Sequence, residues 1–87
     1  KIEKQVSLIQ MMRMMMNKNS EAIAMFTKSL EINGYQAHVY FRRALAYFQE
    51  NQLILALHDL DNAVALGLSA EEEKKLRAAI AKKIDMV

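Results

Sequence analysis

The chain of 87 residues contains no proline and only two glycines, Gly34 and Gly67. Glycine and proline form most of the tight turns that β-rich folds require, so their scarcity disfavours a β-sheet protein. Alanine, leucine, methionine, lysine, glutamate and glutamine dominate instead, and all of these residues favour helices. We therefore expect an all-α fold whose helices are joined by short connections.

The composition excludes several classes of protein. The chain has no cysteine and two histidines, which rules out a disulfide framework and a structural zinc site, and we expect no cofactor or metal. No apolar run reaches the roughly 18 residues of a membrane-spanning helix. A net charge of +2 implies no strong attraction for nucleic acid. We expect an intracellular, cytoplasmic protein and, since the chain opens at Lys1, a fragment of a longer one.

Hydrophobic periodicity and helix-ending residues predict five helices, at residues 2–16, 21–33, 36–50, 53–66 and 71–86. Gly34, Asn51 and Gly67 each follow a predicted helix, where a residue in the left-handed conformation commonly ends it. Ser69 precedes the last helix and Glu72 stands three residues later, which is the spacing of a capping box. Because the connections are short, consecutive helices must be antiparallel neighbours.

Similar residues recur at a spacing of 34 along the chain. The pairs are Asn17 with Asn51, Ala22 with Ala56, Phe26 with Leu60, Leu30 with Val64, and Ile32 with Leu66. A two-helix period of this length is typical of repeat proteins, in which each helical pair buries its face on the next. We expect a single domain over residues 1–87, with one repeat at about 3–36, a second at about 37–70 and a terminal helix at 71–86.

The second of these units resembles the tetratricopeptide repeat family. The residues that match the family pattern are Tyr40, Ala44 and Tyr47 in the first helix of the unit and Ala56, Leu60 and Ala63 in the second. Arg43 replaces a usual leucine, and Leu68 replaces the usual closing proline. The resemblance implies antiparallel helical hairpins that stack as a short right-handed solenoid.

In that family the first helices of successive pairs line a concave groove. The resemblance therefore implies partner-binding residues at Met11, Met14, Met15, His38, Phe41, Arg42, Leu45, Phe48, Lys75, Leu76, Ala79, Lys82 and Lys83. This strip would be apolar with a basic rim, and it would suit a protein or peptide with apolar anchors and acidic flanks. We expect a scaffold or adaptor module for protein–protein interaction.

The family also includes a carboxylate clamp for the C-terminal tails of chaperones, which we do not expect here. The five corresponding positions are Ser7, Met11, Arg42, Glu72 and Leu76. Only Arg42 among them can bind a carboxylate strongly.

Two other functions stay open as alternatives. The methionines at 11, 12 and 14–16 also suit a buried helix, so the chain could be a structural spacer or oligomerisation segment that self-associates through its first helix. Paired basic residues at 42–43, 74–75 and 82–83 could bind RNA or single-stranded nucleic acid with nearby aromatic residues. Glu71, Glu72 and Glu73 on the same helix disfavour that second alternative.

We expect no enzyme activity. His38 and His58 stand twenty residues apart, on different predicted helices, without a cysteine or a nucleophile motif beside them. Asp59 and Asp61 lie on one predicted helix but point about 200° apart, so they cannot share a metal or a proton.

Overall fold

The computed structural model describes residues 18–86, and these residues form helices and no strand. A first helix covers residues 18–32, followed by α2 (Ala37–Gln49), α3 (Leu53–Ala65) and α4 (Ala70–Asp85). The all-α fold is therefore confirmed for this part of the chain, with the boundaries of α2, α3 and α4 close to those predicted. The helix expected at 21–33 differs, because residues 18–20 are already helical. The predicted helix at 2–16 lies outside the described residues.

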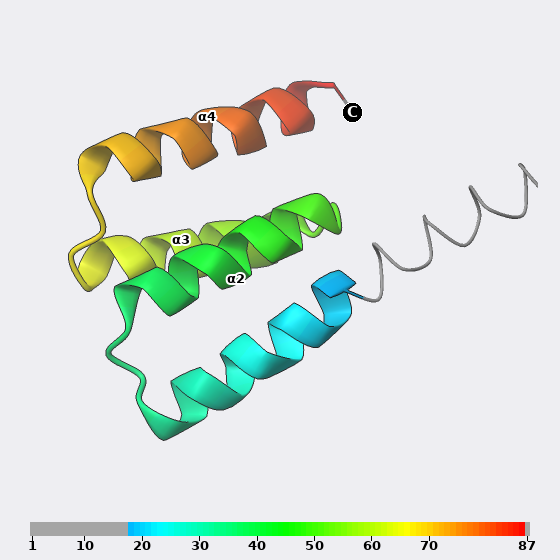
Figure 1. Cartoon of the computed structure of the whole chain (residues 1–87). Helices are drawn as coiled ribbons and strands as arrows, with labels where there is room; N and C mark the ends of the chain where they lie inside the picture. The colour runs from blue at the N-terminus through cyan, green and yellow to red at the C-terminus, as the bar shows by residue number, and fades with distance from the viewer. Residues whose placement is uncertain (1–17, 87) are drawn as a thin grey trace, which may run out of the picture.

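In Figure 1 α4 lies at the top, the helix at residues 18–32 lies at the bottom, and α2 and α3 overlap between them. Consecutive helices are antiparallel, and α3 packs against both α2 and α4. Because α3 runs back between them, α2 and α4 point the same way and begin at the same end of the molecule. This parallel pair forms the two walls of the candidate site described below.

Both α2 and α3 are followed by a residue with a positive φ angle, as predicted. Asn51 has a φ of 62° and Gly67 has a φ of 104°. After α2, the Asn51 N–H donates to the Phe48 carbonyl and the Gln52 N–H donates to the Tyr47 carbonyl. The same pair of hydrogen bonds follows α3. This arrangement is the Schellman motif, which satisfies carbonyl groups that the helix leaves free.

The end of the helix at 18–32 differs from the prediction, because Gly34 does not adopt a positive φ angle. Side chains end this helix instead. The Asn33 carboxamide oxygen accepts a hydrogen bond of 3.0 Å from the Tyr35 N–H. The Gln36 side-chain amide donates to the carbonyls of Ser29 and Asn33 and to the Ser29 hydroxyl. These bonds satisfy groups at the helix end, so no left-handed glycine is needed there.

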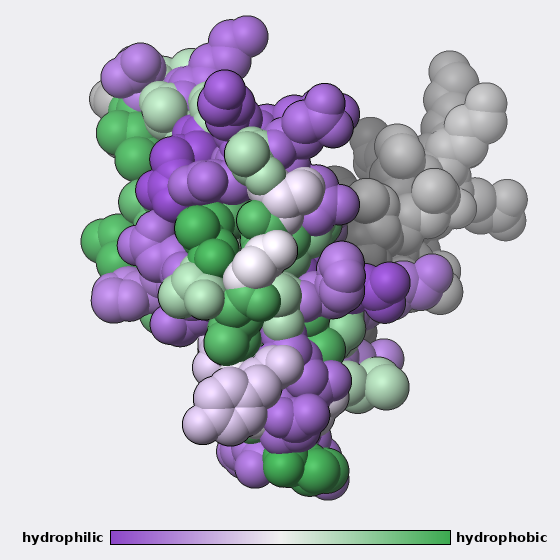
Figure 2. Space-filling view, turned by 90° about the vertical axis from the view of Figure 1, so that its left-hand side faces the viewer, coloured by the Kyte–Doolittle hydropathy of each residue, from purple (hydrophilic) through white to green (hydrophobic). Residues whose placement is uncertain are grey.

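Ser69 caps α4 as predicted, but only one of the two hydrogen bonds of a capping box is present. The Ser69 hydroxyl accepts a hydrogen bond of 3.3 Å from the Glu72 N–H, and Glu71, Glu72 and Glu73 occupy the first turn. Negative charge there is favourable beside the positive end of the helix dipole, as Lys82 and Lys83 are at the other end. Figure 2 looks at the end of the molecule where α4 begins, and hydrophilic side chains predominate over that helix, at the top of the view.

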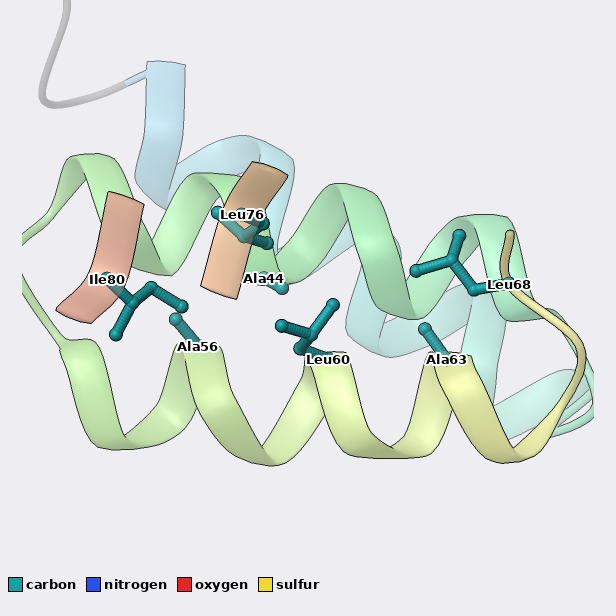
Figure 3. Packing of buried hydrophobic residues seen from close by; sticks show 7 residues of the cluster. All are labelled: Ala44, Ala56, Leu60, Ala63, Leu68, Leu76 and Ile80. Carbon is teal, nitrogen blue, oxygen red and sulfur yellow. The ribbon is translucent and has the colours of Figure 1, made fainter. Parts of the chain in front are cut away.

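The core lies between α2, α3 and α4 (Figure 3). Its buried residues are Ala44, Ala56, Leu60, Ala63, Leu68, Leu76 and Ile80. Alanines at the interface of α2 and α3 allow the two helices to approach closely, while Leu60 and Ile80 are the largest fully buried side chains. Leu76 and Ile80 bring α4 onto this core, which fixes the position of α4 relative to the α2–α3 hairpin.

A buried ion pair joins α2 to α3. Both oxygens of the Asp59 carboxylate accept hydrogen bonds of 2.7 Å from the Arg43 guanidinium. The same guanidinium donates to the Thr27 hydroxyl, at 3.1 Å, and lies over the rings of Tyr40 and Tyr47. Arg43 therefore contacts three helices. A leucine at this position could make none of these polar contacts.

Candidate functional site

An apolar groove of about 310 Å³ lies between α2 and α4. Its lining residues are Phe41, Leu45 and Phe48 from α2 and Glu72, Lys75, Leu76 and Ala79 from α4. Five of these side chains are hydrophobic, and the two charged ones come from the first half of α4. The volume is at the lower end of the range for pockets that bind a ligand.

Helical spacing explains why these side chains share one groove. Phe41, Leu45 and Phe48 stand at positions i, i+4 and i+7, which lie on one face of α2. Leu76 and Ala79 are three residues apart on α4, so they also share a face. Leu76 is only 4% exposed and forms part of the floor, whereas the small side chain of Ala79 leaves the space open.

The structure brings together six of the predicted partner-binding residues. Phe41, Leu45, Phe48, Lys75, Leu76 and Ala79 all line the groove. Three others, His38, Arg42 and Lys82, are exposed on α2 and α4 and do not line it. Met11, Met14 and Met15 lie outside the described residues.

Lys83 has a contact that the sequence did not predict. Its ammonium donates a hydrogen bond of 3.2 Å to the Phe48 carbonyl and lies 4.3 Å from the centre of the Phe48 ring. These contacts combine a capped helix end with a cation–π interaction. Lys83 thus joins the end of α4 to the end of α2 beside the groove. Arg42, Lys75 and Lys82 are exposed, and of these only Lys75 lines the groove.

Glu72 lines the groove, although it was not among the predicted partner-binding residues. Its position could have been predicted, because Glu72 precedes Leu76 by four residues and therefore lies on the same face of α4. Glu72 and Lys75 therefore place one negative and one positive charge on the groove, both from the first half of α4.

The Arg43–Asp59 pair is the second feature that sequence reasoning missed. Its hydrogen bonds raise the pKa of Arg43, with burial acting in the opposite direction. Asp61 points away from Asp59, as predicted, and accepts a hydrogen bond of 2.9 Å from Arg77 on the surface. That bond, together with one to Glu73, raises the pKa of Arg77.

The described part of the chain does not have the side-chain arrangement of the other kinds of site that we considered. His38 and His58 are both exposed, on α2 and α3. Over residues 18–86, no cluster of three histidine, aspartate or glutamate side chains is placed to hold a metal ion. Within the same range no helix combines the length and the apolar character that crossing a membrane requires.

No family model matches the chain, and neither a curated protein nor a solved structure matches it.

Proposed function

We propose that the chain is a protein–protein interaction module that binds a helix or an extended peptide of its partner in the groove between α2 and α4. The observation that carries the proposal is the apolar lining, in which Phe41, Leu45 and Phe48 face Leu76 and Ala79. Aromatic and aliphatic side chains in such a cleft can surround an apolar anchor of a partner. Central residues of this kind usually contribute most of the binding energy.

Positive charges around the groove favour a partner that has acidic residues beside its apolar anchors. Arg42 on α2 and Lys75 and Lys82 on α4 are exposed, and each can approach an acidic side chain of a bound segment. Contacts of this kind raise the rate of association and select among partners more than they raise affinity. The expected partner therefore has apolar anchors with acidic residues beside them.

The proposal extends to the architecture, which we take to be a short tetratricopeptide-like solenoid. Two features support this. The helices α2 and α4 begin 33 residues apart, at Ala37 and Ala70, close to the repeat length of that family. The alanines at 44, 56 and 63 are fully buried at the positions where the family has small residues.

A groove-filling substitution tests the binding role. Peptides are selected from a displayed library of random 16-residue sequences against the full chain, and their dissociation constants are measured by fluorescence anisotropy. Ala79→Met should weaken binding at least tenfold, because the longer side chain occupies the groove while methionine keeps a high helix propensity. Ala81→Met is the matched control, since Ala81 is exposed on the same helix and does not line the groove. It should change binding less than twofold.

Equal affinity of the two methionine variants would contradict the proposal. So would binding of single-stranded RNA that falls steeply between about 50 and 200 mM salt and does not respond to Ala79→Met, because that behaviour indicates phosphate contacts.

A structural spacer or oligomerisation segment is the second candidate. Exposed apolar side chains away from the groove favour it: Met25 is 71%, Ile54 75% and Met86 76% exposed. These side chains stand on different helices, and self-association of the chain would remove some of them from water. Sedimentation velocity over a hundredfold range of concentration distinguishes this candidate, because self-association that survives Ala79→Met would favour it.

A further inference from the structure

The Glu72 carboxylate lines the apolar groove and has no partner among residues 18–86. Within that range it forms no ion pair and accepts no hydrogen bond. In a complete capping box it would accept a hydrogen bond from the Ser69 N–H, but only the bond from the Glu72 N–H to the Ser69 hydroxyl is present. The half-buried Glu72 side chain lies on the groove instead. A carboxylate that has lost part of its contact with water is stabilised by a cation that replaces the lost contacts.

The neighbouring charges leave Glu72 available to a ligand. Lys75 also lines the groove, but it is exposed, and no ion pair joins it to Glu72. Glu73 accepts a hydrogen bond of 3.0 Å from Arg77, and Glu71 is exposed and does not line the groove. Glu72 is therefore the only acidic residue among those that line the groove.

The two phenylalanines of the groove differ in their contact with cations. The ring of Phe48 has the Lys83 ammonium 4.3 Å from its centre, whereas no cation from residues 18–86 lies over the ring of Phe41. Phe41 is in the first half of α2 and Glu72 is in the first turn of α4. Since the two helices begin at the same end of the molecule (Figure 1), this ring and this carboxylate lie at the same end of the groove.

An aromatic ring and a carboxylate together suit a guanidinium, which stacks on the ring and donates two hydrogen bonds to the carboxylate. The same combination holds Arg43 inside the fold. Its guanidinium lies 5.7 and 5.8 Å from the ring centres of Tyr40 and Tyr47 and donates two hydrogen bonds to Asp59. In the groove, Phe41 supplies a ring at the end where Glu72 supplies a carboxylate, and a ligand would supply the guanidinium.

We infer that the partner segment carries an arginine beside its apolar anchor, and that this arginine binds the Glu72 carboxylate and the Phe41 ring. The inference rests on the proposed function and adds the chemistry of one specific residue of the partner. Acidic flanks of the partner meet Arg42 and Lys82 outside the groove, whereas the arginine enters the groove itself.

Parallel peptide selections test the inference on the full chain. The displayed library of random 16-residue sequences is selected against wild type, Glu72→Gln and Glu71→Gln. Glutamine removes the charge and keeps the length of the side chain. Glu71 is the matched control, because it lies in the same helical turn, is exposed and does not line the groove. Arginines beside the hydrophobic anchor should be more frequent in the wild-type and Glu71→Gln pools than in the Glu72→Gln pool.

A synthetic peptide from the wild-type pool measures the coupling between the two charges. Its arginine is replaced by citrulline, which has a similar shape without the charge, or by lysine. Citrulline should weaken binding to wild type and to Glu71→Gln about fivefold more than it weakens binding to Glu72→Gln, as expected for a charge pair at the edge of water. Lysine should recover part of the loss, because an ammonium pairs with a carboxylate but does not stack on a ring as a guanidinium does.

NMR locates the arginine without any substitution in the protein. The same peptide is made with an isotope-labelled arginine and bound to the wild-type chain. A nuclear Overhauser effect is expected from the side-chain N–H of this arginine to the ring protons of Phe41. An effect to the ring of Phe48 alone would overturn the inference.

The outcomes distinguish the inference from the proposed function. Peptides that bind, weaken with Ala79→Met and show no preference for arginine overturn the inference and keep the proposed function. Equal coupling of the arginine to Glu71 and to Glu72 also overturns it, because the attraction then requires no contact. A library that yields no peptide sensitive to Ala79→Met overturns both. A dimer that Ala79→Met dissociates, or amide shifts at Phe41 and Glu72 when Arg13→Gln is introduced in the free chain, would identify the chain itself as the occupant and overturn the inference.

Discussion

The carboxylate of Asp59 on α3 accepts two hydrogen bonds, both of 2.7 Å, from the guanidinium of Arg43 on α2. Asp59 is only 3% exposed, so its charge is removed from water and depends on this partner. A planar, two-point contact fixes the rotation of one helix about the other more narrowly than apolar packing does. Arg43 thereby sets the geometry of the hairpin that forms one wall of the groove.

Removal of one partner should be costly. Breaking a buried ion pair leaves an uncompensated charge, with a typical cost of 3–5 kcal/mol. Because the Arg43 side chain is 17% exposed, we expect about 3 kcal/mol for Asp59→Ala. Urea denaturation followed by circular dichroism measures the loss. The double variant Arg43→Met with Asp59→Leu should recover most of it, because no charge is then buried. If the double variant is as unstable as Asp59→Ala, the pair stabilises the fold by more than the mutual neutralisation of its two charges, and the expectation is wrong.

Substitution of Arg43 by lysine should make stability depend on alkaline pH. The hydrogen bonds to Asp59 raise the pKa of Arg43, so its contribution is complete below its unfolded pKa and disappears only as pH rises through the folded one. The interval between the unfolded and the folded pKa of Arg43 lies above the pH range in which proteins are usually studied. Lysine loses its proton near an unperturbed pKa of about 10.4. The difference in unfolding free energy between wild type and Arg43→Lys should therefore stay nearly constant from pH 7 to about pH 10 and grow as pH rises above about 10.4. Stability curves that stay parallel above about pH 10.4 would contradict the expectation.

The two glycines should respond in opposite directions to alanine. Gly67 has a φ of 104°, and a Cβ there would meet no atom within 4 Å, so the cost of Gly67→Ala is conformational alone. We expect a loss of about 1 kcal/mol. Gly34 has no positive φ, and a Cβ would meet only the Leu30 carbonyl at 3.6 Å, an ordinary contact. Gly34→Ala should therefore raise stability by about 0.5 kcal/mol, because it restricts the unfolded chain. Thermal unfolding of both variants measures the two effects, and a destabilised Gly34→Ala would be the contrary result.

Phe48→Ala should affect binding more than folding. The ring lines the groove and is partly exposed, so we expect a stability loss of about 1–2 kcal/mol, less than for a fully buried phenylalanine. Part of that loss comes from the contact with Lys83. The affinity for a selected peptide should fall by more than 30-fold, which exceeds 2 kcal/mol. Equal losses in the two measurements would identify Phe48 as a core residue and remove it from the site.

The helices of residues 18–86 could be predicted largely from residues that end them. Asn51, Gly67 and Ser69 each act as the sequence indicated, because their effects are local. Gly34 was assigned wrongly, since the side chain of Gln36 reaches back seven residues to the Ser29 carbonyl and changes how the helix ends. Such a bond depends on the path of the connection, which a pattern of residue types does not contain.

The groove was predictable to the extent that helical spacing determines it. Six predicted residues line it because they lie on the inner faces of two parallel helices. The contacts that cross between helices were not predictable in the same way. Arg43 and Asp59 are 16 residues apart, and Lys83 and Phe48 are 35 apart, so each pair depends on the packing of whole helices. The charge of Lys83 was assigned to the rim, whereas the structure places it on the Phe48 carbonyl and ring.

The three fully buried alanines beneath the groove have a consequence for how such a module changes over evolutionary time. Ala44, Ala56 and Ala63 set the distance between α2 and α3, and α4 rests on the same hairpin. A single added methyl group there would shift a wall of the groove without altering any surface residue. Substitutions at positions that never contact the partner can therefore change which partner is preferred. Two chains with identical surfaces could prefer different ligands.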